Sequence, residues 1–110
     1  MEEKANILIV EDKPEDALFL ENLLTSIGYK VWVVQKGEDA LKLVKNMPFA
    51  AVLTELFLSS MPGVEITKNV LKISPYVNII LMTTYSFIGS AIEVMEYGAY
   101  GYITKPFNPI

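Results

Sequence analysis

The chemically versatile side chains of this 110-residue sequence stand at or just after the ends of its apolar runs. They are Glu11, Asp12, Glu55, Thr83 and Lys105. Carboxylate oxygens are the ligands that hard cations such as Mg²⁺ prefer, and a hydroxyl and an ammonium group add further polar contacts. If the runs are parallel strands, their carboxyl ends share one edge, where open α/β sheets bind their ligands. The sequence therefore predicts a ligand-binding edge that is rich in carboxylates.

The residue types that are absent narrow this chemistry. The chain has no Cys, His or Arg, and its nine basic residues are all Lys. Disulfides, thiolate nucleophiles, imidazole bases and bidentate Arg clamps are therefore excluded. Thirteen acidic residues against nine basic ones give a net charge of −4. Because no basic stripe is present to neutralise phosphates, we expect no direct binding of nucleic acid.

Apolar runs that alternate with helix-periodic segments must position these side chains. Strands are predicted over 5–10, 31–34, 49–55, 77–83 and 99–104. Helices are predicted over 14–27, 37–46 and 64–73, and in a segment that starts near Ile88 and ends at Gly98. Strands that alternate with helices indicate a parallel sheet, and the run 5–10 is too apolar on both faces to lie at its edge. The predicted fold class is therefore α/β.

The extent of the chain leads to further expectations about its domain and location. Its length suits one domain, near the lower size for a sheet covered on both faces. The charged start, Met1 to Lys4, is unlike a signal peptide, and no run approaches membrane-spanning length, so we expect a cytoplasmic protein without membrane contact. No helix is predicted after the fifth strand, which would leave an apolar patch. We expect residues 1–110 to be the N-terminal part of a longer protein, truncated before its last helix; a second subunit over the patch is the alternative.

Four segments of the chain resemble the receiver domain of two-component response regulators. They are Ile7 to Asp12, the loop from Glu55 through Gly63, Thr83, and Gly98 to Phe107. The resemblance covers nearly the whole chain and implies a flavodoxin-like, doubly wound parallel sheet with five strands in the order 2-1-3-4-5, lacking only the final helix. It implies a signal-transduction module of a phosphorelay rather than an enzyme. The implied partners are a histidine kinase or another signalling protein and an attached or separate output domain, and homodimerisation stays an open question.

The resemblance implies a metal site at the ends of the first and third strands. Glu11 and Asp12 would bind Mg²⁺ together with Glu55, and the backbone carbonyl of Phe57 would complete the site. Glu55 stands where the family has the Asp that accepts a phosphoryl group from the kinase. Such a transfer depends mainly on positioning and on electrostatic stabilisation, and a carboxylate nucleophile gives an acyl-phosphate.

The resemblance also implies a group of phosphoryl-binding and switch residues on the last two strands. Thr83 would bond the phosphoryl group, and Lys105 would supply positive charge beside it. Tyr102 would couple to the movement of the Thr83 hydroxyl. Thr84 stands where the family usually has a small residue, and we expect it to crowd this site.

Glu55 is the main departure from the family pattern. Its extra methylene moves the carboxylate outward by roughly 1 Å, and a misplacement of that size costs about 10²-fold in rate. The longer side chain would instead reach Lys105 or Thr83, imitate part of the phosphorylated state and produce a pseudo-receiver that signals without phosphorylation. The alternative is a conventional Mg²⁺-dependent receiver that uses Glu55 as its acceptor. In the same loop, Ser59 and Pro62 replace the usual Pro and Asp.

Simpler structural explanations compete with these assignments. Glu11 and Asp12 could be solvated acids at the start of a helix, and Glu55 could form a structural ion pair with Lys105. A Mg²⁺ site predicts that mutual repulsion raises the pKa values of its carboxyl groups when no ion is bound. A third function, that of a haloacid-type Mg²⁺-dependent phosphatase, is disfavoured because the sequence has no Asp-x-Asp pair.

Overall fold

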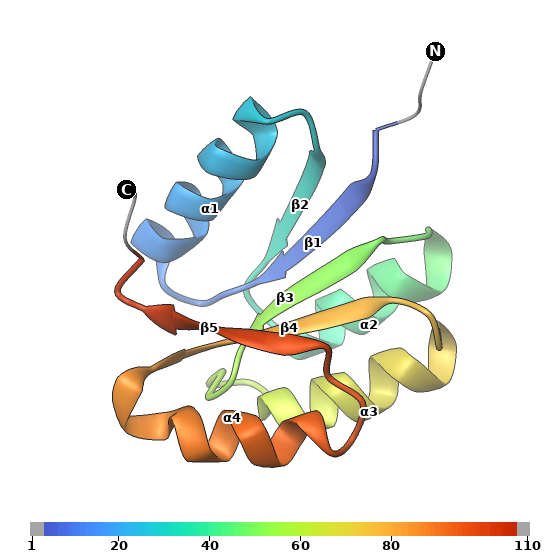
Figure 1. Cartoon of the computed structure of the whole chain (residues 1–110). Coiled ribbons are helices and arrows are strands. Elements are labelled where there is room, and N and C mark those ends of the chain that lie inside the picture. Colours follow the sequence, from blue (N-terminus) through green and yellow to red (C-terminus); the bar gives the residue numbers. More distant parts are fainter. Residues whose placement is uncertain (1–3, 108–110) are drawn as a thin grey trace.

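One parallel sheet forms the centre of the molecule in the computed structural model, which describes residues 4–107 (Figure 1). Its strands are β1 (Asn6–Val10), β2 (Lys30–Val34), β3 (Ala51–Glu55), β4 (Asn78–Thr84) and β5 (Gly101–Lys105). They lie in the order β2-β1-β3-β4-β5, and all neighbouring strands are parallel. The predicted α/β class and strand order are confirmed, and the apolar strand β1 lies inside the sheet as its composition requires. A cis peptide bond joins Lys105 to Pro106 directly after β5.

Four α-helices within residues 4–107 cover the two faces of the sheet unequally. They are α1 (Pro14–Ser26), α2 (Gly37–Asn46), α3 (Gly63–Ile73) and α4 (Ile88–Met95). Helix α1 lies alone on one face, and α2, α3 and α4 lie side by side on the other (Figure 1). The longest helix, α1, has 13 residues, and no helix in this part of the chain has the length and apolar character needed to cross a membrane.

The ends of the helices follow mostly from local sequence. Pro14 occupies the first turn of α1, where its missing N–H leaves no helical hydrogen bond unmade. Gly28 and Gly98 follow α1 and α4 with φ angles of 107° and 109°, in the left-handed region that favours glycine. The sequence does not predict the short 3₁₀-helix η1 (Tyr85–Phe87) before α4. The prediction that α1 extends through Ile27 is wrong, because the helix ends at Ser26 and leaves the Ile27 side chain exposed.

Two apolar cores, one on each face of the sheet, hold the strands in place. The larger core lies between the sheet and α2, α3 and α4, and its fully buried residues include Leu8 and Ile66. The smaller core lies under α1 and includes Ile9 and Met82. Leu8 and Ile9 belong to different cores because successive side chains of a strand point to opposite faces. Burial on both faces leaves the strand ends as the place where polar side chains of the sheet can meet.

An apolar groove lies open beside α1, on the face of the sheet that α1 alone covers. Its volume is about 610 Å³, and its lining includes Phe19, Leu23, Ile88, Tyr102 and Phe107. The rings of Phe19 and Phe107 stack with their centroids 5.6 Å apart. The groove is therefore an exposed apolar surface on the face that α1 covers.

Candidate functional site

The carboxyl ends of four strands bring the predicted polar residues to one edge of the sheet. Glu11 directly follows β1 and Glu55 ends β3. Thr83 of β4 pairs with Thr104 of β5, and Lys105 ends β5 opposite Thr84. The relative exposure of Glu11, Glu55, Thr83 and Lys105 is 1%, 8%, 1% and 5%. Because a buried charge is costly unless it is paired, the partners of these groups decide what the site can do.

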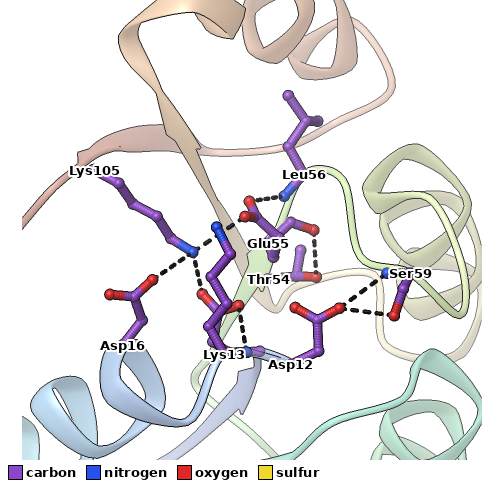
Figure 2. Close-up of polar contacts among 9 residues, drawn as sticks. Asp12, Lys13, Asp16, Thr54, Glu55, Leu56, Ser59 and Lys105 are labelled. Carbon is purple, nitrogen blue, oxygen red and sulfur yellow. Dashed lines mark hydrogen bonds and ion pairs between the residues drawn. The ribbon is translucent and has the colours of Figure 1, made fainter.

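The ammonium group of Lys105 lies among three carboxylates (Figure 2). Its Nζ donates hydrogen bonds to Glu11 Oε1 and to Glu55 Oε1, the latter at 3.1 Å. It also lies 3.0 Å from Asp16 Oδ2 in an ion pair. Asp16 is not among the residues that the sequence predicts for the site. The available signal was its place in the acidic first turn of α1, the helix that follows Glu11 and Asp12.

Burial and pairing together set the protonation of this cluster. Burial lowers the pKa of Lys105, but its hydrogen bonds to the three carboxylates outweigh that effect and raise the pKa above its ordinary value. Burial raises the pKa of the Glu11 carboxyl group, while the hydrogen bond from Lys105 acts in the opposite direction. The positive charge in the cluster is therefore the protonated Lys105 itself.

Asp12 is bonded to the loop between β3 and α3 rather than to Lys105 (Figure 2). Its Oδ2 accepts hydrogen bonds from the Ser59 backbone N–H at 3.2 Å and from the Ser59 hydroxyl at 2.8 Å. Burial opposes ionisation, but these hydrogen bonds outweigh it and lower the pKa of Asp12. The expectation that repulsion raises the carboxyl pKa values is therefore wrong for Asp12, because the hydrogen bonds from Ser59 stabilise its charged form. The raised pKa of Glu11 comes mainly from burial.

Donors contact both carboxylate oxygens of Glu55. Oε1 accepts the hydrogen bond from Lys105, and Oε2 accepts one from the backbone N–H of Leu56 at 2.8 Å. The sequence predicts that Glu55 reaches Lys105 or Thr83, and the structure shows the contact with Lys105. The hydroxyl of Thr83 is buried and has no hydrogen-bond partner in the part of the chain that the structure describes.

The remaining predicted residues line two separate pockets, a cavity at the sheet edge and the apolar groove beside α1. A cavity of about 220 Å³ at the sheet edge is lined by Asp12, Lys13, Glu55, Phe57, Thr83, Thr84 and Phe87. The ring of Phe57 packs edge-to-face on that of Phe87, with the centroids 4.7 Å apart, and Thr84 is exposed. Tyr102 lines the apolar groove beside α1 instead. The structure thus brings Glu55, Thr83 and Thr84 together and places Tyr102 elsewhere.

The carboxylates in their present arrangement do not fit a metal ion. Among residues 4–107, no three side chains of His, Cys, Asp or Glu are grouped as they would be around an ion. Oxygens of Glu11, Asp12 and Glu55 accept hydrogen bonds from protein donors instead. An ion bound by these residues would compete with these donors, and the ligand set inferred from the sequence stays a prediction.

A family comparison agrees with this fold. The family model for the response regulator receiver domain matches residues 7–110. The chain therefore belongs to the response regulator receiver domain family. Receiver domains are signalling modules of two-component systems rather than typical enzymes, and they generally bind Mg²⁺ at their phosphorylation site.

The chain is similar in sequence to curated proteins and in fold to solved structures. The transcriptional regulatory protein ZraR of Klebsiella oxytoca is 32% identical over 106 residues, which are 96% of this chain and 24% of ZraR. The chain thus spans about a quarter of the length of that relative. A CheY-like receiver domain protein from Methanospirillum hungatei superposes with a TM-score of 0.89 at 28% identity, over 97% of this chain and 86% of that one. A Burkholderia pseudomallei response regulator, solved with a phosphorylated aspartic acid, a calcium ion and citrate, has a TM-score of 0.86 at 28% identity, over 96% and 62% of the two chains.

Proposed function

We propose that this chain is a receiver that signals without phosphorylation at Glu55. The observation that carries the proposal is the ion pair between Glu55 Oε1 and Lys105 Nζ at 3.1 Å. This contact places a negative charge beside Lys105 without a phosphoryl group. It is one of the two contacts through which the longer side chain of Glu55 would imitate the phosphorylated state.

The engagement of both Glu55 oxygens opposes their use as nucleophiles. An attacking oxygen must approach the phosphorus in line with the leaving group, and misplacement by roughly 1 Å costs about 10²-fold in rate. One Glu55 oxygen is bonded to Lys105 and the other to the Leu56 N–H. Each Glu55 oxygen thus already shares a lone pair with a donor, which lowers its nucleophilicity toward a phosphodonor and fixes its orientation. This favours the pseudo-receiver over a conventional phosphoaccepting domain.

The proposed imitation of the phosphorylated state is partial. The Thr83 hydroxyl has no hydrogen-bond partner within residues 4–107, and Tyr102 is 36% exposed. Glu55 thus already contacts Lys105, as a phosphoryl group would in this proposal. In this part of the chain Thr83 and Tyr102 make no such contact and can change position when a partner binds. In this proposal a partner, rather than chemistry at Glu55, changes the state of the domain.

The partners in this proposal follow from the family and its relatives. ZraR is a transcriptional regulatory protein, and we propose that this receiver likewise passes its signal to an output domain, attached or separate. A histidine kinase or another signalling protein is the proposed input. The cytoplasmic location and any homodimer remain predictions from the sequence.

Intact-mass analysis after incubation with Mg²⁺ and acetyl phosphate tests the proposal. The unmodified chain is compared with Glu55→Asp, which restores the shorter acceptor. Glu65→Asp, at an exposed position of α3, is the matched control for the loss of one methylene. We expect a phosphoryl adduct on Glu55→Asp and none on the unmodified chain or on Glu65→Asp.

The other outcomes separate the two candidate functions. An adduct on the unmodified chain that is lost in Glu55→Gln would refute the pseudo-receiver and support a conventional receiver with Glu55 as acceptor. The absence of an adduct on every variant would support a phosphorylation-independent domain. It would also refute the argument that Glu55 alone prevents transfer.

A further inference from the structure

We propose that Ser59 and Lys105 replace a divalent ion as the groups that hold the site carboxylates in place. The inference rests on the proposed function, because it explains how the site stays assembled in a receiver that performs no phosphoryl transfer. It is carried by side-chain contacts that connect the loop after β1, the loop after β3 and the end of β5 (Figure 2).

Lys105 provides the first of these connections. An ammonium group has three donors and one positive charge, and here it meets three carboxylates, from Glu11, Asp16 and Glu55. These residues belong to the segment after β1, to α1 and to β3. One side chain therefore joins β5 to three other elements at the place where carboxylates would otherwise repel each other.

Ser59 provides the second connection. Both its backbone N–H and its hydroxyl donate to the same oxygen, Asp12 Oδ2, at 3.2 Å and 2.8 Å. The two residues are 47 positions apart in the sequence, so this contact joins the loop after β1 to the loop after β3. A proline at position 59 would have neither donor, so the departure from the family pattern at this position creates the contact.

The neighbouring Ser60 shows that the contact is specific to Ser59. The hydroxyl oxygen of Ser60 accepts a hydrogen bond from the Gly37 N–H at 3.0 Å, at the start of α2. Both serines thus anchor the same loop, but only Ser59 bonds to a site carboxylate. This difference provides a matched control within one loop.

The arrangement has a consequence for Mg²⁺. The ion demands oxygen ligands at about 2.0–2.1 Å in near-octahedral geometry. Ser59 holds Asp12 through Oδ2, and Lys105 holds Glu11 and Glu55 through their Oε1 atoms, so binding an ion in that geometry would compete with these contacts. The folded chain therefore gains little from Mg²⁺, and releasing Asp12 should strengthen the binding of the ion.

Thermal melting and titration calorimetry with MgCl₂, without any phosphodonor, test this proposal. A ligand that binds the folded state raises the melting temperature. We expect MgCl₂, compared with EDTA, to leave the melting temperature of the unmodified chain nearly unchanged, because this chain binds Mg²⁺ only weakly. We expect Ser59→Ala to bind Mg²⁺ about tenfold more tightly than the unmodified chain, a factor that corresponds to about 1.4 kcal/mol. Ser60→Ala should leave the Mg²⁺ affinity unchanged, and Ser59→Thr, which keeps the hydroxyl, should behave like the unmodified chain.

Two results would overturn the proposal. One is a clear rise in the melting temperature of the unmodified chain on addition of Mg²⁺. This measurement does not depend on whether any variant folds. The other is an equal affinity for Mg²⁺ in Ser59→Ala and the unmodified chain. Neither result depends on phosphoryl transfer. The proposed function is refuted by a different observation, a phosphoryl adduct on the unmodified chain, so the two failures can be told apart.

Discussion

Replacement of Lys105 by methionine is the most direct test of how the site is held together. Methionine has a similar unbranched shape but carries neither a charge nor a donor. The substitution leaves three carboxylates without their shared cation, from Glu11, Asp16 and Glu55. We expect Lys105→Met to fold with a large loss of stability.

The size of this loss follows from the burial of each partner. The side chains of Lys105 and Glu11 are 5% and 0% exposed, and removing one member of a buried ion pair costs about 3–5 kcal/mol. The Asp16 side chain is 28% exposed, so solvent limits its part to less than about 1 kcal/mol. We expect a total loss of about 3–5 kcal/mol in the free energy of unfolding, against a typical total of about 5–15 kcal/mol for a domain.

Urea unfolding followed by circular dichroism measures this change. Lys42→Met, at an exposed position of α2, is the control and should change stability by less than about 0.5 kcal/mol. Adding Glu11→Gln to Lys105→Met removes the unpaired buried charge and should recover at least about 1 kcal/mol. A loss in Lys105→Met no larger than that in Lys42→Met would refute the argument that Lys105 is the structural cation of the site.

Two further substitutions test the packing around the site by thermal melting. Thr83→Val exchanges a buried hydroxyl, which has no hydrogen-bond partner among residues 4–107, for a methyl group of the same size; we expect unchanged stability or a gain of up to about 1–3 kcal/mol. A clear loss would show that the hydroxyl does have a partner. Gly63→Ala would place its Cβ 2.9 Å from both the Cα and the carbonyl oxygen of Leu56, and should cost about 1–3 kcal/mol. Gly89→Ala is the control, because a Cβ at that position has no neighbouring atom within 4 Å in the described part of the chain. It should stabilise the exposed start of α4 by about 0.5–1 kcal/mol. Equal melting temperatures for Gly63→Ala and Gly89→Ala would contradict this packing.

Most of the fold was predictable because its signals are local. The predicted helix over 37–46 coincides with α2 (Gly37–Asn46), since a strong apolar period and a following proline mark its length. Strand boundaries shifted by one or two residues; β3 begins at Ala51 rather than at residue 49. Phe49 is apolar but fills the larger core from outside the strand. Periodicity thus identifies which residues are buried better than it identifies where a strand begins.

The candidate site was predictable only as a set of positions. The strand order follows from the family resemblance, and it brings Glu11, Glu55, Thr83 and Lys105 to one edge because parallel strands end together. The sequence therefore determined which residue types gather there. It did not indicate that Tyr102 would line the groove beside α1 instead of the cavity beside Thr83.

Only the tertiary structure decided which of these groups bond to one another. Lys105 and Glu11 are 94 positions apart and Asp12 and Ser59 are 47 apart, and Asp16 joins the cluster from the first turn of α1. Hydrogen bonds form only within a few tenths of an ångström of their preferred length, so the choice of partner depends on side-chain positions that no local pattern encodes. The sequence by itself determined a receiver fold with an acidic strand edge. The packing of α1, the loop after β3 and β5 around that edge decided that Lys105 and Ser59 hold its carboxylates.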